Sequence, residues 1–557
     1  MVNLAVSRLL GNYVLGTTIL VTIFVSPWNS IDPVNMPKLS LLGFLGYVAA
    51  FLVISQHNFF RTKSLFPVLI TVSVFVVLLL AQLFFNDSDF FFKLYGTPGR
   101  NTAFLAYFSL AMVLLATVVA ASTQFLKRYL IGLIATGAAL AIYGLFQWRG
   151  MDLFDYVNAY GSNVFGTFGN QNFQSAFMGM VAASATVWLL FGKINRKFKL
   201  TLFVVALLAF LNIRLSSEQG YLNYMAGLVS AGTIYLLVTN RKKLGLLLLG
   251  TSILGGVVLV SGIFNKGPMA DLIYKSSLQA RGFYWQAAMN MMGDNPLMGV
   301  GLDGFGDWYR RSRTLEVAQF SPNIVADTAH SIPLDIGSSG GLPLLIAYLA
   351  FIALALVSIV RVVRRSTEFD VVFASLVAAW VAYQAQSLIS INQLGLGVWG
   401  WSLTGLMIGY ELNTRNLHNH QILKTEKSKK SLPDKIPASA LILSVIGGGF
   451  GLAISLPPYL AANKYYTALQ SGNAVVLQES AYLKPYDRTR FLFTAQILIE
   501  NKLEKEAIKL LSDASLIYPD NIDLWQRWSQ IPSASSEQIA KAKAEIKRLD
   551  PFNPELK

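Results

Sequence analysis

The chain has 557 residues, of which 54% are hydrophobic and only 13% are charged, and this composition excludes an ordinary soluble domain. The absence of cysteine excludes disulfides, thiolate metal sites and a cysteine nucleophile. A formal net charge of +15 would suggest nucleic acid as the partner of a soluble protein, but here about half of the Lys and Arg residues fall in short loops, where they act as topology signals.

Apolar segments of spanning length recur from Gly11 to Leu456, and they predict an all-α, polytopic membrane protein with about 13 transmembrane helices. The first segment lacks an A-x-A-like cleavage site before the next one, so we interpret it as a retained span. Asn392 and Gln393 form either a turn between two spans or a polar break in one long helix. The predicted spans are 10–27, 39–55, 65–85, 102–122, 129–147, 173–192, 199–213, 219–239, 244–264, 337–360, 370–390, 394–412 and 437–456.

Alternate loops between these spans are rich in Lys and Arg, and the remaining loops are poor in them. By the positive-inside rule, the rich loops and the N-terminus face the cytoplasm. An odd number of spans then places the loop at about 265–336, and the chain after about 457, on the outer face of the membrane. The positive clusters are Arg61/Lys63, Lys127/Arg128, Lys193/Arg196/Lys197/Lys199, Arg241/Lys242/Lys243, Arg361/Arg364/Arg365, and six Lys or Arg residues between Arg415 and Lys435.

The tail after the last span is charged, amphipathic and helix-forming. The letters KPYD at 484–487 recur 34 residues later as YPDN at 518–521, and 32 residues after that as DPFN at 550–553. Proline between helix pairs at this period is typical of tetratricopeptide repeats, and a plain helical domain without repeat ancestry is the alternative. We predict a transmembrane catalytic domain at 1–458 and an extracytoplasmic helical domain at 459–557. Because two or three repeats are few for independent stability, we expect the helical domain to pack on the membrane domain. It also offers a surface for a protein partner.

His330 is the only histidine in the predicted outer loop. An imidazole with an ordinary pKa near 6.5 suits a general base at neutral pH, and Asp327 or Asp335 is close enough in sequence to orient it. The alternative is a loop histidine that only forms hydrogen bonds. The other three histidines, in predicted cytoplasmic loops, are His57, His418 and His420.

Three arginines, Arg100, Arg214 and Arg281, fall in predicted outer segments. Arginine on that face runs against the positive-inside bias and often has an anionic partner, and guanidinium groups suit pyrophosphate oxygens. The alternative is that each reaches out to lipid headgroups. Arg281 opens an amphipathic stretch with Trp285 that is suited to the membrane interface.

The turn VFGTFGNQNF at 164–173 precedes a predicted span. Its glycines allow a close backbone approach, and Asn170 can cap the following helix or offer its amide to sugar hydroxyls. No HExxH or Walker-type motif and no cluster of His or carboxylate residues stands out in the chain, so we predict no metal, no cofactor and no ATP.

Three features together resemble one family: the 164–173 turn, the R-x-x-x-W…DNPLMGVGLDGF stretch from Arg281, and D-x-x-H at Asp327–His330 followed by GSSGGLPLLIAYL. They are similar to the O-antigen ligase and O-antigen polymerase superfamily of bacterial envelopes, which includes pilin-type O-oligosaccharyltransferases. The resemblance covers about 95–412. Tetratricopeptide-like tails also occur in members of this family.

The resemblance implies metal-independent, inverting glycosyl transfer on the outer face of the bacterial cytoplasmic membrane. The donor would be a glycan on undecaprenyl pyrophosphate, and the acceptor a lipid, a glycan or a protein. The family histidine maps onto His330 and the loop arginine onto Arg281, as the catalytic pair. The substrate-binding candidates are Arg214, Gln219, Arg100, Asn170, Asn172, Trp285 and Asp327.

Two positions depart from the family pattern. Ser331 stands where the family often has Asn after the histidine, and Gln219 stands where it often has Arg in Ser-Arg-Gly. Glutamine can donate a hydrogen bond to a phosphate but cannot neutralise it, so Arg214 or Arg100 would have to supply the second positive charge.

Two other classes compete with this hypothesis. A transporter or flippase of lipid-linked glycans would need polar residues at mid-span and internal repeats, which the predicted spans lack. A peptidoglycan polymerase of the shape and division class would need an essential loop aspartate and fewer spans.

Overall fold

A computed structural model describes residues 4–26, 32–154, 164–273, 276–422 and 435–554. The described residues form helices, turns and loops and no strand, which confirms the predicted all-α class. Residues 423–434, in the predicted cytoplasmic loop after Arg415, lie outside the described residues.

A helix stands at each of the thirteen predicted spans. Eleven described helices are long and apolar enough to cross a membrane. The helices at the predicted spans are α1 (Leu4–Ile23), α2 (Asn35–Ile54), α4 (Phe66–Phe85), α6 (Phe104–Ala120), α7 (Thr123–Trp148), α8 (Gln171–Phe191), α9 (Arg196–Ser216), α10 (Gln219–Val238), α11 (Lys242–Ile263), α16 (Ile332–Arg365), α17 (Val371–Ile389), α18 (Leu394–Ile422) and α19 (Ala438–Ser455).

The two predicted spans outside the group of eleven are α6 and α18, and both lie in the centre of the bundle. α6 has 17 residues, and α18 is rich in Gly, Trp, Ser and Thr. Every residue of α18 from Leu394 to Glu411 is buried, so this helix needs no lipid-facing apolar surface. A count based on length and apolar composition alone therefore omits two of the helices that run through the centre of the bundle.

Glycines on α18 allow it to lie directly against α6. A Cβ at Gly405 would come within 2.3 Å of the Leu114 carbonyl oxygen, and one at Gly409 within 2.5 Å of that of Val118. Small residues at such a contact permit the close backbone approach on which helix association in a membrane depends. Asn392 and Gln393 form a real turn, because α17 ends at Ile389 and α18 begins at Leu394.

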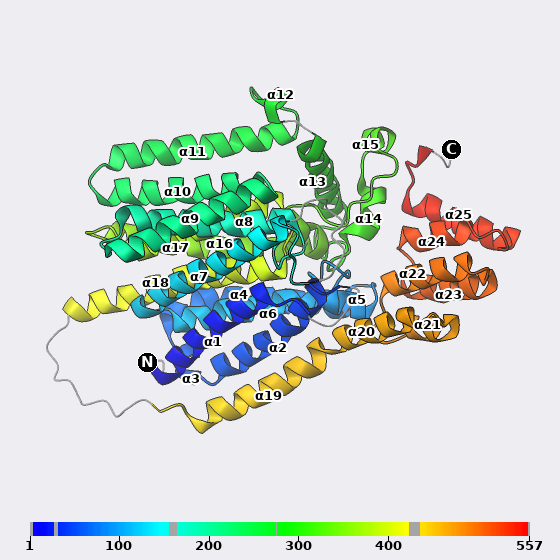
Figure 1. The fold of residues 1–557 in the computed structure, drawn as a ribbon, viewed down its shortest axis with the longest axis horizontal. Coiled ribbons are helices and arrows are strands. Elements are labelled where there is room, and N and C mark those ends of the chain that lie inside the picture. Colours follow the sequence, from blue (N-terminus) through cyan, green and yellow to red (C-terminus); the bar gives the residue numbers. More distant parts are fainter. Residues whose placement is uncertain (1–3, 27–31, 155–163, 274–275, 423–434, 555–557) are drawn as a thin grey trace.

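The two ends of the bundle differ in what they carry (Figure 1). The α10–α11 connection with Arg241 lies at one end, together with α3 (His57–Phe60) and the start of α1. At the opposite end lie α5 (Phe90–Tyr95), the helices of the long loop and the C-terminal helices. The loop helices are α12 (Ala270–Ile273), α13 (Ser276–Asp294), α14 (Phe305–Ser312) and α15 (Leu315–Phe320), and a short η1 (Lys63–Leu65) precedes α4.

The helix α16 is broken at Gly341, whose φ of 75° is left-handed. The turn at 295–301 fits into this break: Val300 N–H donates to the Ser338 carbonyl (2.8 Å), and Leu342 N–H donates to the Pro296 carbonyl (2.8 Å). Gly299 is also left-handed, and a Cβ there would meet the Ser338 carbonyl at 2.5 Å. Two motifs noted in the sequence are therefore interlocked, and the first half of α16 is held as a separate, buried segment.

The C-terminal helices continue directly from the last span, because α19 leads into α20 within two residues (Figure 1). They form three helix pairs around a hydrophobic core of their own, which includes Leu510, Leu524 and Trp528. Phe92 of α5 belongs to the same core, so this domain packs on the membrane domain. The pairs are α20 (Pro457–Gln470) with α21 (Ala474–Ala481), α22 (Arg488–Glu500) with α23 (Glu504–Ile517), and α24 (Ile522–Ser529) with α25 (Ser536–Leu549).

Candidate active site

A cavity of about 380 Å³ lies at the end of the bundle that carries the long loop. It is bounded by the start of α8, by α13, by the loop before α16, by the end of α17 and by the turn before α6. Six of the nine residues predicted for the site line it: Arg100, Asn170, Asn172, Arg281, Asp327 and His330.

His330 is held by the backbone around it. Its φ of 52° is left-handed, which is uncommon for a residue with a side chain. Ala329 N–H donates to Asp335 Oδ1 (2.6 Å), and His330 N–H donates to Thr328 Oγ1 (3.3 Å). Asp335 thus fixes the loop through a backbone amide, and the predicted contact between Asp335 and the imidazole does not form.

The electrostatic surroundings keep the His330 imidazole neutral. The pKa of His330 is lowered to about 4, chiefly by burial and further by the Arg100 and Arg281 guanidiniums, against the opposing effect of Asp327. The ring lies against that of Tyr284, with centroids 5.5 Å apart. A neutral imidazole in a cavity can accept a proton, but at this lowered pKa it is a weaker base than the ordinary imidazole assumed from the sequence.

Arg281 enters the cavity from the first half of α13. Its Nε donates to the Ile389 carbonyl at the end of α17 (2.9 Å), which ties the long loop to the bundle. Burial lowers the pKa of Arg281, but an arginine remains charged at any physiological pH. Arg281 and His330 therefore line one cavity, as the sequence predicted.

Arg100 and Asp327 form a two-point ion pair. Arg100 Nε lies 2.8 Å from Asp327 Oδ2, and Nη2 lies 3.0 Å from Oδ1. Burial alone would raise the pKa of Asp327, but the Arg100 guanidinium outweighs it and holds the pKa below its usual value. The carboxylate that was expected to orient His330 is bonded to Arg100 instead.

The two asparagines of the 164–173 turn line the cavity from the start of α8. Asn170 Oδ1 accepts a hydrogen bond from Asn172 N–H (2.8 Å), so Asn170 is the helix cap that the sequence allowed. Asn172 Oδ1 accepts from Ser217 Oγ (2.7 Å). Both amides also border the cavity, so the capping and binding interpretations are compatible.

Three predicted residues do not line the cavity. Arg214 is exposed at the end of α9. Gln219 lies behind Asn172, beyond Ser217, and its Nε2 is buried without a hydrogen-bond partner. Trp285 is buried against Ile263 and Phe264, so it packs in a small apolar cluster and faces away from the cavity.

Tyr284 lines the cavity and was missed in the sequence. Its ring contacts His330 on one side, and Tyr309 lies edge-on at 5.6 Å. On a helix, residues three and four positions after Arg281 both lie near its face, so spacing alone does not decide which of them enters the cavity. The sequence analysis chose Trp285, and the structure places Tyr284 in the cavity.

Chemically, the lining carries two guanidiniums, one carboxylate and a neutral imidazole, so one positive charge is in excess. That arrangement suits an anionic group beside a proton acceptor. Among the described residues, no three His, Asp or Glu side chains gather as a metal site would require, and metal independence stays a prediction.

A family model described as O-Antigen ligase matches residues 169–349. No curated protein matches the chain. The matched segment runs from the entry of α8 to the second half of α16, so it supplies Asn170, Asn172, Arg281, Asp327 and His330 to the cavity. The comparison therefore supports an O-antigen ligase domain at residues 169–349 of this multi-pass membrane protein.

Proposed function

We propose that this protein transfers a glycan from undecaprenyl pyrophosphate to an acceptor hydroxyl on the outer face of the cytoplasmic membrane. The observation that carries the proposal is the single cavity in which a neutral His330 lies with Arg281 and Arg100. It lies at the bundle end opposite the loop with Arg241, in keeping with an extracytoplasmic site under the positive-inside rule.

In this reaction, His330 takes the proton from the acceptor hydroxyl as its oxygen attacks the anomeric carbon. The bond from that carbon to the pyrophosphate oxygen breaks, and undecaprenyl pyrophosphate leaves with the electron pair. Attack from the face opposite the leaving group inverts the anomeric configuration. Arg281, with Arg100, stabilises the charge that develops on the leaving pyrophosphate.

Arg100 fits the role of the second cation better than Arg214, because Arg100 lines the cavity and Arg214 does not. The Gln219 side chain makes no bond to Ser217 or Asn172, since only its backbone N–H donates to Ser217 Oγ (3.5 Å). The assignment of Arg100 accounts for the departure from the Ser-Arg-Gly pattern: the missing charge comes from a different segment of the chain.

The test is transfer of surface glycan in cells that carry His330→Ala or Arg281→Ala in place of the native protein. Each variant must insert and accumulate normally, and Arg149→Ala is the matched control, since Arg149 is exposed at the same end and does not line the cavity. We expect a loss of at least about a hundredfold for His330→Ala. Normal transfer by both variants would remove the proposal.

Glycans from a deletion strain would identify the acceptor. Loss of long chains indicates polymerisation, accumulation of long lipid-linked chains indicates ligation to a lipid, and an unglycosylated protein indicates an oligosaccharyltransferase. Accumulation on the inner leaflet would instead support a flippase.

A further inference from the structure

The C-terminal domain contacts the long loop at α14 through buried ion pairs. Asp550 lies 2.9 Å from Arg313 and 3.3 Å from Arg310, and its side chain is fully buried. A charge removed from water is costly when it is left without its partner, so separation of Asp550 from these arginines is disfavoured. The position of α14 is therefore tied to the C-terminal domain.

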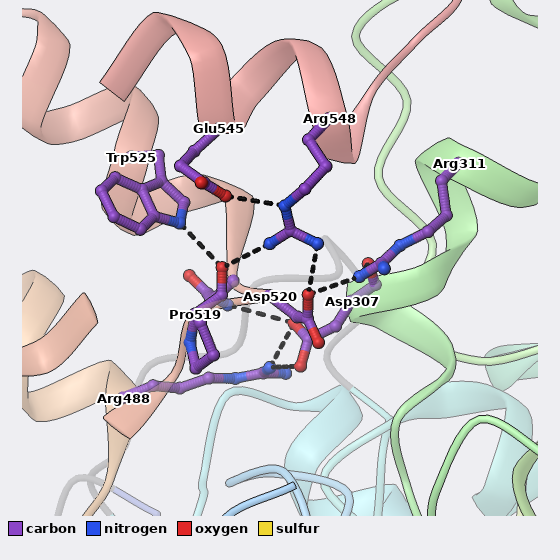
Figure 2. Close-up of polar contacts among 9 residues, drawn as sticks. Asp307, Arg311, Arg488, Pro519, Asp520, Trp525, Glu545 and Arg548 are labelled. Carbon is purple, nitrogen blue, oxygen red and sulfur yellow. Dashed lines mark hydrogen bonds and ion pairs between the residues drawn. The ribbon is translucent and has the colours of Figure 1, made fainter. Parts of the chain in front are cut away.

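A second contact is made by Arg488, at the start of α22. Its Nη1 lies 2.6 and 2.7 Å from the two carboxylate oxygens of Asp307 on α14, and Figure 2 shows the guanidinium directed at this carboxylate. Its Nη2 donates to Thr97 Oγ1 (3.1 Å). One side chain of the C-terminal domain thus binds both α14 and the turn between α5 and α6.

Thr97 also forms a hydrogen bond with Asp303, which lies just before α14 in the long loop. Its N–H donates to Asp303 Oδ2 (2.6 Å), and the other carboxylate oxygen accepts from Thr102 Oγ1 (2.9 Å). Asp303 and Arg488 together hold the two ends of a six-residue turn. Arg100 lies in the middle of that turn, and its amide N–H donates to the Thr97 carbonyl (3.0 Å).

A continuous set of bonds therefore runs from the C-terminal domain to the cavity. Arg488 binds Thr97, the turn carries Arg100, and Arg100 binds Asp327 three residues before His330. Sequence gave no sign of this connection, because its members are separated by hundreds of residues.

We propose that Arg488 is a positioning residue, which makes the C-terminal domain part of the active-site scaffold: by joining Thr97 to Asp307, it fixes the turn that carries Arg100 into the cavity. The inference rests on the proposed function, since it assigns Arg100 to donor binding. It predicts that loss of Arg488 impairs transfer at a cavity that Arg488 does not touch.

The test measures two quantities on the full-length protein in nanodiscs. The first is hydrogen exchange of the amides at 97–102, which we expect to speed up by about tenfold in Arg488→Ala because a charge-assisted bond is lost. The second is glycan transfer, which we expect to fall by roughly tenfold, mainly through a higher KM for the lipid-linked donor.

Two further comparisons separate positioning from general damage. Arg548→Ala is the matched control, because Arg548 lies on the same surface and pairs with Asp520 (3.0 Å), but its bonds stay within the C-terminal domain. Thr97→Val removes the hydroxyl that accepts from Arg488 (3.1 Å) and makes a longer bond to the Asp303 carbonyl (3.5 Å), and Thr97→Ser keeps it. We expect Thr97→Val to reproduce the effect of Arg488→Ala and to add nothing when the two are combined.

Each outcome decides between the inference and the proposed function. Unchanged exchange at 97–102 in Arg488→Ala overturns the inference, whatever the transfer rate. Faster exchange with normal transfer also overturns it, and Arg100→Ala then shows whether the assignment of Arg100 to the donor was the error. Equal effects of Arg488→Ala and Arg548→Ala would indicate a role in domain stability alone.

Discussion

Arg100 and Asp327 bridge two segments 227 positions apart, with Nε–Oδ2 and Nη2–Oδ1 distances of 2.8 and 3.0 Å. The pair joins the turn before α6 to the loop before α16. It explains why an aspartate three residues before His330 has no bond to the imidazole: its two oxygens are used to hold a cation at the cavity wall.

The geometry of this pair is expected to matter more than its charge. Arg100→Lys keeps the positive charge but cannot bridge both oxygens, so we expect roughly tenfold slower transfer. Asp327→Asn should give a similar loss, and the double variant should lose little more than either single one. Initial rates with purified protein and lipid-linked donor measure this, and native rates for Arg100→Lys would contradict it.

The second prediction concerns pH. With the pKa of His330 at about 4, the neutral imidazole persists through neutral pH, and transfer should fall only as the pH drops through that value. Arg281→Gln removes a cation that lowers the pKa of His330, so the acid limb should move to higher pH. The same lowered pKa means that the folded state disfavours the protonated imidazole, so the contribution of His330 to stability is complete above pH 6.5 and declines toward pH 4.

Because the chain has only four histidines, the His330 resonance can be assigned by substitution in a ¹⁵N-histidine spectrum and titrated directly. An ordinary titration midpoint near 6.5 would show that the cavity is wetter and less positive than described.

A third prediction concerns Tyr284, whose ring packs against His330 in the cavity. Tyr284→Phe retains the ring against His330, so transfer should stay within about threefold of the native rate, whereas Tyr284→Ala removes the support and should cost roughly a hundredfold. Trp285→Phe is the control at the neighbouring position. Because Trp285 packs outside the cavity, we expect this variant to have a lower melting temperature and a nearly native transfer rate. Rates and melting temperatures in detergent distinguish these outcomes, and equal loss in all three variants would contradict the assignment.

The fourth prediction concerns the break in α16. Gly341→Ala places a Cβ 2.5 Å from the Leu297 carbonyl at a left-handed residue, so we expect a loss of at least about 2 kcal/mol in stability. Gly449→Ala, in open space on α19, is the control and should be neutral. Fluorescence-detected size-exclusion chromatography after heating measures the stability of both variants. A Gly341→Ala protein as stable as the native one would show that the turn at 295–301 can shift to accommodate the added Cβ.

The apolar runs of the sequence located a helix at each of the thirteen predicted spans, including α6 and α18, which are buried in the bundle. Six of the twelve residues that line the cavity were also predicted, since His330 and two of the outer arginines were unusual for their positions. The sequence could not show that Asp327 pairs with Arg100, that Trp285 turns away, or that Arg214 stays outside, because side-chain direction depends on packing between distant segments. Asp303 and Asp307 belong to no recognisable motif, and their partners, Thr97 and Arg488, become visible only in three dimensions.

The three proline-containing turns of the C-terminal domain meet the membrane domain one after another. Arg488 follows the first turn, Asn521 in the second donates to Asp307, and Asp550 opens the third. The spacing of these three turns is thus matched to the residues of α14 that they contact. Inserting or deleting one helix pair would displace the remaining turns from α14, so the number of helix pairs in the C-terminal domain is constrained by its contact with the membrane domain.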